Sequence, residues 1–401
     1  MRESRPFQPM ISFDRYVALL KPADLRQTIT ASMVGRLPIG ITGLAILLLV
    51  QTSSGSFALG GAATAAYVIG LAAMAPALGR IIDRYGPRET LFACAFAFPT
   101  ALGALVAAVH QFPGSWAVLL CAAVAGAAFP PITVCMRAYF RRRLRSEELL
   151  AAAYSLESVL IELIFIVGPL IVALFVAAVS AAAAVLFAAA CGLLGTLLFL
   201  RSPPLRQWEI APRSAPSLLG PLATPGFAPL VAVILCYSMA FGLLEVGLTA
   251  YATEAGNVAL AGVLLGLMSA GSALGGLAYG SRSWHFPLAR QFTLMLGLMG
   301  VGLSLLALPW PPVPFALWSV FAGVVMAPAL IIQSMLVAKA ARPEQLTEAF
   351  TWSASALLSG VGIGVAAGGA LLEYFPSGAA LGAGGAVALL AAAGSVMLAR
   401  A

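Results

Sequence analysis

The stretch GRIIDRYGPR, residues 79–88, carries four charged side chains and two glycines within ten positions. Long apolar segments flank it on both sides, and apolar runs of about twenty residues have the length needed to cross a bilayer. We therefore interpret the stretch as a tight turn at a membrane surface. Gly79 would let one helix end approach a neighbouring helix closely, and Gly86 would permit a sharp backbone turn.

The charged side chains of the turn suggest specific contacts. Asp83 could bind a cation or cap a helix N-terminus, while Arg84 and Arg88 could hold that helix and anionic lipid heads. The alternative is a positively charged loop of the kind found in many membrane proteins. An aspartate directly beside an arginine favours the more specific interpretation.

In its spacing the stretch resembles the loop motif between helices 2 and 3 of the major facilitator superfamily of secondary transporters. The matching positions are Gly79, Asp83, Arg84, Gly86 and Arg88. Members of that family usually have basic residues where this chain has Pro87 and Glu89, so the basic part of the motif is weaker here. The resemblance implies that the turn acts as a gating loop.

The composition is that of a membrane protein. Of 401 residues, 61% are hydrophobic and 9% are charged, whereas soluble domains average about 25% charged residues. In a membrane protein a net charge of +7 is explained by basic residues in the loops on one side of the membrane. We therefore expect no nucleic-acid partner. The five cysteines show no metal-binding spacing and the two histidines are far apart, so we expect no metal site, and no cofactor beyond a proton gradient. The chain has no nucleotide-binding loop or catalytic triad, so we expect no enzyme.

Twelve apolar segments predict an all-α integral membrane protein with twelve transmembrane helices in two pseudo-symmetric six-helix bundles. The predicted segments are 29–50, 57–78, 89–110, 115–137, 149–174, 178–200, 227–250, 258–280, 287–308, 315–338, 347–372 and 378–399. The corresponding domain limits are an N-terminal tail at 1–28, a first bundle at 29–200, a linker at 201–226 and a second bundle at 227–401. We expect the tail and the linker to be cytoplasmic.

Basic residues fix the expected orientation. All but one of the 22 lysines and arginines fall in the termini or in loops on one side of the predicted membrane. By the positive-inside rule, both termini are cytoplasmic. The preference for arginine over lysine and the alanine-rich spans suggest a bacterial cytoplasmic (inner) membrane. We expect contact with membrane lipids, and a monomer.

The two bundles are related in sequence. A shift of 197 residues aligns predicted segments 4 and 5 with 10 and 11, and places Pro131 on Pro328. A shift of 201 places Gly79 on Gly280, but no acid follows Gly280, so the second copy of the loop motif is eroded. The superfamily resemblance implies that substrate binds between such halves near the membrane midplane.

Four ionisable residues lie inside predicted spans, where a charge costs several kcal/mol unless it is paired or hydrated. Arg36 and Glu157 lie at matching depth, so they form either a structural ion pair or a substrate-facing arginine held by a glutamate. Glu162 has no arginine left to pair with, which makes it the first choice for proton coupling, and Glu157, the other carboxyl of this segment, is a further candidate for it. For Glu162 the alternative is a permanently protonated, hydrogen-bonded acid. Glu245, further outward, could be a gate or a second proton site.

Several further residues are candidates. Gly168 and Pro169 predict a break in segment 5, and they match the Gly-Pro core of a motif that antiporters of the superfamily carry. Polar and aromatic residues that could line a substrate cavity, or simply pack, are Tyr154, Tyr237, Gln333 and Trp352. Pro38 should kink segment 1.

The function that these features favour is proton-coupled efflux, by alternating access, of a small and partly apolar molecule or metabolite. An uptake symporter or a facilitator of a small organic solute on the same fold is the main alternative. A membrane sensor that has lost transport is a further one, although buried charges count against it.

Overall fold

The structure is a computed structural model that describes residues 14–54, 57–111, 116–202, 205, 208, 220–256, 259–284, 286–372 and 374–399. Within these ranges every regular element is a helix, and twelve helical stretches are long and apolar enough to cross a membrane. Residues 1–13 of the predicted tail and most of the predicted linker lie outside the described ranges. The predicted domain limits stay a prediction.

The first half of the chain forms what we call the N half. Its helices are α1 (Asp14–Leu20), α2 (Ala23–Arg36), α3 (Pro38–Ser54), α4 (Phe57–Tyr85), α5 (Pro87–Gln111), α6 (Trp116–Ala127), α7 (Ile132–Arg143), α8 (Glu147–Ala178) and α9 (Ala181–Leu200). Helix α1 is a short element that the sequence analysis did not separate from the tail.

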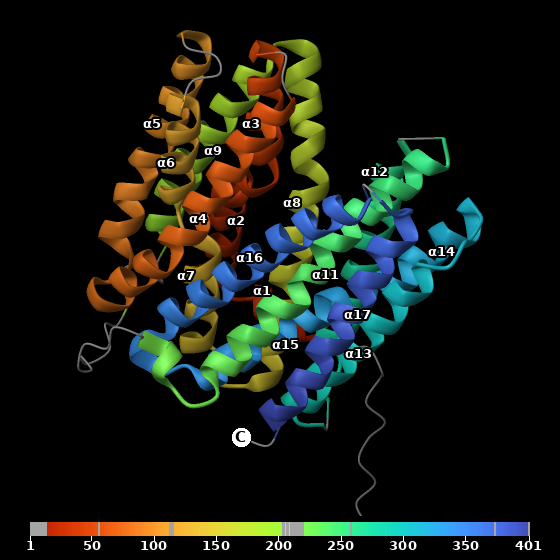
Figure 1. Cartoon of the computed structure of the whole chain (residues 1–401). Helices are drawn as coiled ribbons and strands as arrows, with labels where there is room; N and C mark the ends of the chain where they lie inside the picture. The colour runs from red at the N-terminus through yellow and green to blue at the C-terminus, as the bar shows by residue number, and fades with distance from the viewer. Residues whose placement is uncertain are drawn as a thin grey trace, which may run out of the picture.

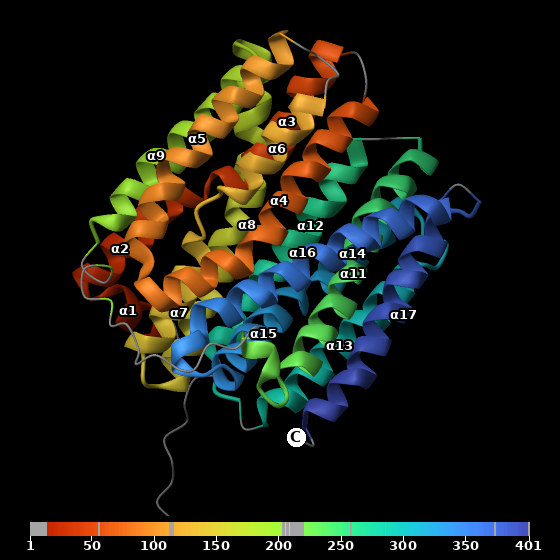
Figure 2. The same ribbon diagram turned by 60° about the vertical axis from the view of Figure 1, so that its left-hand side comes forward.

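The second half of the chain forms the C half. Its elements are η1 (Gly220–Ala223), α11 (Phe227–Glu254), α12 (Ala259–Ser281), α13 (Leu288–Leu306), α14 (Pro312–Gly323), α15 (Met326–Ala340), η2 (Pro343–Gln345), α16 (Leu346–Leu372), α17 (Ser377–Ser395) and η3 (Val396–Ala399). Figures 1 and 2 show the two halves as separate groups of long helices that lie side by side.

Three of the spans are broken where backbone hydrogen bonding is interrupted. The first is divided at Leu37, just before Pro38, which is the predicted kink. The fourth is interrupted at 128–131, ahead of α7, and the tenth at 324–325, ahead of α15. The last two breaks fall at equivalent positions of the two halves, because they are about 197 residues apart.

Glycines at matching positions show the internal repeat directly. A Cβ at Gly70 of α4 would overlap the backbone of Ala123 in α6, and a Cβ at Gly271 of α12 would overlap that of Val320 in α14. These pairs are related by the shifts of 201 and 197 residues found in the sequence. Because only glycine allows so close an approach, the two halves pack equivalent helices in the same way, and the pseudo-symmetry is confirmed.

The halves are held together mainly by α4 against α16 and by α8 against α12 and α15. The contacting residues lie toward the end of the molecule that carries the basic loops, here called the basic end. Toward the opposite, or far, end the two groups of helices diverge, as Figure 1 shows. The molecule is therefore sealed between its halves at the basic end.

Candidate transport site and gating contacts

Asp83 caps the N-terminus of α16 from the other half of the protein. Its Oδ1 accepts a hydrogen bond from the backbone N–H of Thr347 at 3.0 Å, and its Oδ2 accepts one from that of Glu348 at 2.7 Å. The first N–H groups of a helix have no partner within the helix, and the dipole makes this end positive, so a carboxylate is stabilised there. The side chain is almost fully buried.

Two arginines complete this contact. Arg80 donates from its Nε at 3.1 Å and from a terminal nitrogen at 2.7 Å to Oε1 of Glu348. Arg142 of α7 lies 3.5 Å from Oδ1 of Asp83. We call Arg80, Asp83, Arg142, Thr347 and Glu348 the charged interface.

The expectation that Arg84 and Arg88 hold the capped helix is wrong. Both are exposed: Arg84 lies over the ring of Tyr85, and Arg88 lines a pocket of about 630 Å³ together with Arg201. The reason is the direction in which each side chain projects from α4. Arg80 is three residues from Asp83 and shares its face, whereas Arg84 is adjacent in sequence and points elsewhere. Contact of Arg84 and Arg88 with lipid stays a prediction.

The two glycines of the motif have the predicted backbone roles. Gly86 has a φ of +89°, a left-handed conformation that favours glycine, and it makes the turn between α4 and α5. A Cβ at Gly79 would lie 2.9 Å from the Cα of Glu348, so glycine is needed for the approach of α4 to α16.

The equivalent contact between α8 and α12 is centred on hydroxyl groups, with Arg15 at its edge, 3.4 Å from Oε2 of Glu148 and donating to the Oγ of Ser283 at 2.9 Å. The Oγ of Ser155 donates to the backbone oxygen of Gly276 at 2.6 Å. The hydroxyl of Tyr16, from α1, lies 2.8 Å from Ser155 Oγ and donates to the carbonyl of Leu277 at 3.1 Å. Burial raises the pKa of Tyr16, so its hydroxyl stays protonated. We call Tyr16, Ser155, Gly276 and Leu277 the hydroxyl interface.

Arg36 and Glu157 form the ion pair expected from their matching depth. Their side chains are 1% and 2% exposed, and a terminal nitrogen of Arg36 donates to Oε1 of Glu157. The guanidinium also donates to the Oγ of Ser32 at 2.7 Å and to its backbone oxygen at 3.2 Å. Arg36 is thus satisfied within the N half.

A second arginine at this pair was missed by sequence reasoning, which assigned it to a basic loop. The Nε of Arg137 lies 3.8 Å from Oε2 of Glu157, and its side chain is 20% exposed. Helix α7 continues to Arg143 and belongs to a candidate span, so Arg137 lies within that span and not in a loop. The available signal was its place inside the predicted segment 115–137, four residues before the run of arginines at 141–143.

Glu162 connects the two halves through a serine. The Oγ of Ser272 in α12 donates to Oε1 of Glu162 at 2.9 Å, and it accepts from the backbone N–H of Ala327 at 3.1 Å. Ala327 is the second residue of α15, directly after the break in the tenth span. A carboxyl of the N half is therefore linked to a helix N-terminus of the C half.

Three other candidates, Gly168, Pro169 and Glu245, lie on α8 and α11. Helix α8 runs without interruption through Gly168 and Pro169, so the predicted break is absent. Gly168 instead allows close packing, because a Cβ there would lie 2.5 Å from the backbone carbon of Gly40 in α3. Glu245 is exposed on α11, in the part of that helix nearer the far end, where a charged group requires water.

The proposed cavity residues are mostly part of the core. Tyr237 is fully buried and donates to Oε1 of Gln333, whose Nε2 donates to Ser353 at 2.7 Å. Tyr154 is 1% exposed and donates to the backbone oxygen of Arg137 at 3.2 Å. Trp352 is half-buried against the main apolar cluster. Of the two interpretations, packing fits Tyr154, Tyr237 and Gln333 better, because their polar groups are satisfied inside the protein.

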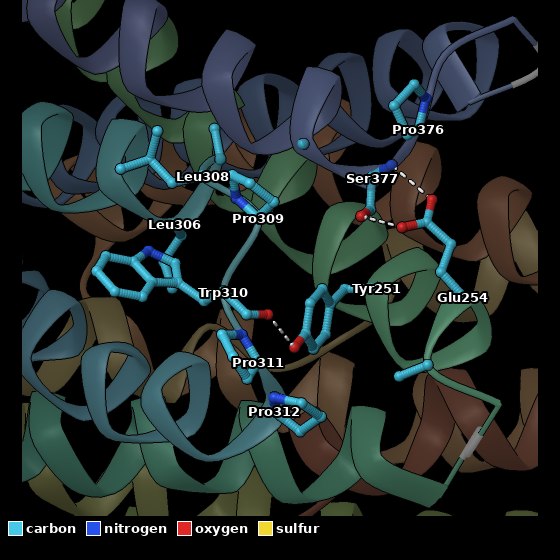
Figure 3. Close-up of a pocket in the computed structure, with 13 residues that line it drawn as sticks. Tyr251, Glu254, Leu306, Leu308, Pro309, Trp310, Pro311, Pro312, Pro376 and Ser377 are labelled. Carbon is cyan, nitrogen blue, oxygen red and sulfur yellow. Dashed lines mark hydrogen bonds between the residues drawn. The ribbon is translucent and has the colours of Figure 1, made fainter.

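A pocket of about 610 Å³ lies at the far end of the C half, between the ends of α11, α13 and α17 (Figure 3). Glu254 caps α17 here: its Oε1 accepts from the N–H of Ser377 at 2.7 Å and its Oε2 from the Oγ at 2.5 Å. The Tyr251 hydroxyl donates to the carbonyl of Trp310 at 2.9 Å. Because its lining residues come from one half, this pocket is not a site between the halves.

Several solved structures share this architecture. A human organic anion transporter, MFSD10 (TETRAN), is 17% identical, with a TM-score of 0.72 over 93% of this chain and 100% of that one. A bacterial homologue of the iron transporter ferroportin, in an outward-facing state, is 15% identical, with a TM-score of 0.77 over 94% and 99%. The fucose:proton symporter FucP of E. coli is 13% identical, with a TM-score of 0.73 over 94% and 97%. At these identities the likeness shows the fold alone.

Sequence comparison finds fewer similar proteins than structural comparison does. A search of curated proteins finds no match. The family model for the Major Facilitator Superfamily, however, matches residues 28–283, which is more than half of the chain and extends from the N half through α12 of the C half. Together with the twelve candidate spans and the pseudo-symmetric halves, this match shows that the chain belongs to the major facilitator superfamily.

Proposed function

We propose that the protein is a proton-coupled secondary transporter that works by alternating access, with Glu162 as its proton-carrying group. The observation that supports this most is the bond from Glu162 to Ser272, because it joins the two halves. Rocking of one half against the other would break this bond. A carboxyl whose partner depends on conformation would bind a proton differently in the two states, and this is the basis of coupling.

The seal at the basic end supports an assignment of conformation. If the basic end is cytoplasmic, as the distribution of arginine and lysine favours, the closed charged and hydroxyl interfaces correspond to an outward-facing state. Asp83 would then act as a gate, because its bonds to the N-terminus of α16 must break before the cytoplasmic side opens.

The direction of transport that we favour is export of a small, partly apolar molecule in exchange for protons. Its support is the Gly168-Pro169 pair, which matches the core of the antiporter motif in sequence although α8 remains continuous. Uptake together with protons, or facilitated diffusion, would use the same fold and the same interfaces.

The deciding experiment uses purified protein in proteoliposomes that contain a pH-sensitive dye. Lipophilic cations, sugars, amino acids and organic acids are added in turn, and proton movement is recorded with the wild type and with Glu162→Gln. Antiport predicts outward proton movement during inward substrate flux, and Glu162→Gln should abolish it while substrate exchange continues. Inward proton movement would instead establish symport.

The matched control is Glu245→Gln, which removes another acid from a span but one that does not bridge the halves. We expect it to retain coupled proton movement. Substrate exchange by the wild type without any proton movement would make the protein a facilitator and Glu162 a structural residue. Absence of all flux for every class would favour the sensor alternative.

A further inference from the structure

We propose that Arg137 is the binding site for a carboxylate or phosphate group on the transported solute, so that the substrate is an amphipathic anion. The proposal rests on the proposed transport function. It concerns what the site recognises, however, and not how transport is driven, so the two can fail separately.

The first argument is the balance of charge around Glu157. Two guanidinium groups, those of Arg36 and Arg137, share this one carboxylate. Arg36 takes the short contact to Oε1 and is further satisfied by Ser32, so it belongs to the scaffold. The cluster keeps one uncompensated positive charge, and this charge resides on Arg137.

The second argument is the unused hydrogen-bonding capacity of Arg137. A guanidinium carries five N–H donors and no acceptor. Among the described residues no acceptor takes a hydrogen bond from its Nε, which is buried, and the 3.8 Å contact to Glu157 Oε2 is too long to be one. Oε2 of Glu157 likewise has no donor. A buried charged donor without a partner is costly, so Arg137 lacks the compensation that Arg36 has, and an anionic ligand would reach its guanidinium through the exposed fifth of the side chain.

The third argument is location. Arg137 lies where the N half meets the C half, close enough to the Tyr237 hydroxyl of α11 to interact with it electrostatically. Toward the basic end, Tyr154 packs edge-on against Phe140 and Phe350, with ring centroids 6.4 Å and 6.2 Å away, and covers that side. A fifth of the Arg137 side chain remains exposed, six residues before the basic end of α7.

The chemistry of the ligand follows from the group that would hold it. The planar fork of arginine matches carboxylate and phosphate oxygens with two parallel hydrogen bonds, which a lysine cannot reproduce. Two aromatic residues beside it, Tyr154 and Tyr237, belong to the main apolar cluster, so we expect the remainder of the solute to be apolar. A cation would be repelled by the excess charge.

The experiment measures binding to the full-length protein in detergent micelles by thermal stabilisation, at constant ionic strength. The probes are two matched sets, hexanoate, hexanamide and hexylamine, and benzoate, benzamide and benzylamine, with phenyl phosphate added to separate phosphate from carboxylate. We expect at least one anionic probe to stabilise the wild type, and its amide and amine counterparts not to do so.

The variants are Arg137→Gln, Arg137→Lys and the control Arg145→Gln, which removes an exposed arginine close to the same helix. Arg137→Gln should weaken anion binding at least tenfold, the scale of a lost charge-assisted hydrogen bond. Arg137→Lys should retain part of it, and Arg145→Gln all of it. If Arg137→Gln fails to fold, the comparison of Arg137→Lys with the control decides.

Three outcomes would overturn the proposal. They are stronger stabilisation by the amines or amides, equal anion binding by Arg137→Gln, and no stabilisation of the wild type by any anionic probe. A loss of proton coupling in Glu162→Gln with anion selectivity intact would contradict the proposed coupling but leave this inference in place.

Discussion

The charged and the hydroxyl interfaces occupy equivalent positions in the two-fold repeat, yet they use different chemistry. In both, a glycine brings two helices together: Gly79 faces Glu348 and Thr351, and Gly280, 201 residues later, faces Ser155 and Tyr16. At the first, the Asp83 carboxylate caps a helix beside Arg142, and Arg80 pairs with Glu348 of the capped helix. At the second, neutral hydroxyls bond to backbone oxygens, and α1 supplies one of them.

The comparison shows which properties the repeat preserves. Close backbone approach is common to both interfaces and depends on geometry alone, so the duplicated glycines retain it. Polar bonding is not duplicated. Where the second copy of the motif lacks its acid, the short helix α1 brings Tyr16 to the same place. We therefore expect the shared geometry to have larger effects on gating than the distinct chemistry.

The largest effect is expected when bulk is added at the shared glycines. Gly79→Leu and Gly280→Leu should each prevent closure at the basic end, because no space exists for a side chain at either position. Spin labels at Val179 and Tyr374, exposed at the far ends of the N and C halves, would report the change as a shorter distance. Gly61→Leu, at a glycine with open space around it, is the control. Unchanged distances would contradict the geometric equivalence.

A smaller but still large effect is expected for Asp83→Asn. The substitution removes the negative charge that accepts two backbone hydrogen bonds. Hydrogen bonds to a charged group are worth roughly 1.5–3 kcal/mol. We therefore expect substrate flux in proteoliposomes to fall about tenfold or more, while membrane insertion is retained. Glu254→Gln is the matched control, because it alters a carboxylate cap of α17 that lies within one half. Normal flux in Asp83→Asn would remove its role in gating.

The smallest effect is expected for Tyr16→Phe. It removes neutral hydrogen bonds to Ser155 and Leu277, each with a net value of about 0.5–1.5 kcal/mol, so the population closed at the basic end should fall by a few-fold. The same spin-label pair measures it. Because no charge is lost, the shift should be insensitive to salt, whereas that of Asp83→Asn should vary with ionic strength. A shift as large as that of Asp83→Asn would mean that α1 is the dominant contact.

The sequence was sufficient for features that depend on local composition or backbone freedom. Long apolar runs are visible without a structure, as are the turn at Gly86, the kink at Pro38 and the repeat. Asp83 as a helix cap and the Arg36–Glu157 pair could also be predicted, because each needed only a partner of opposite charge at matching depth.

Features that depend on helical phase or on distant packing could not be predicted. Arg80, and not Arg84, faces the capped helix because of its phase relative to Asp83. Ser272 reaches Glu162 from 110 residues away, which no local pattern reveals. The polar side chains of Tyr237 and Gln333 within apolar spans suggested a cavity lining. In the structure the Tyr237 hydroxyl donates a hydrogen bond to Gln333 inside the core. Arg137 could not be told apart by sequence from the loop arginines that follow it on α7, at positions 141–143.

The ring of Trp208, in the connection between the halves, stacks on Arg142 of the charged interface. The ring lies 4.5 Å from the Arg142 guanidinium, which in turn lies beside Asp83. Opening of the charged interface would displace Arg142 and change the environment of this indole. The protein thus carries an intrinsic fluorophore beside the charged interface. If the other five tryptophans are replaced by phenylalanine, the emission of Trp208 alone would report each opening in real time, without any attached label.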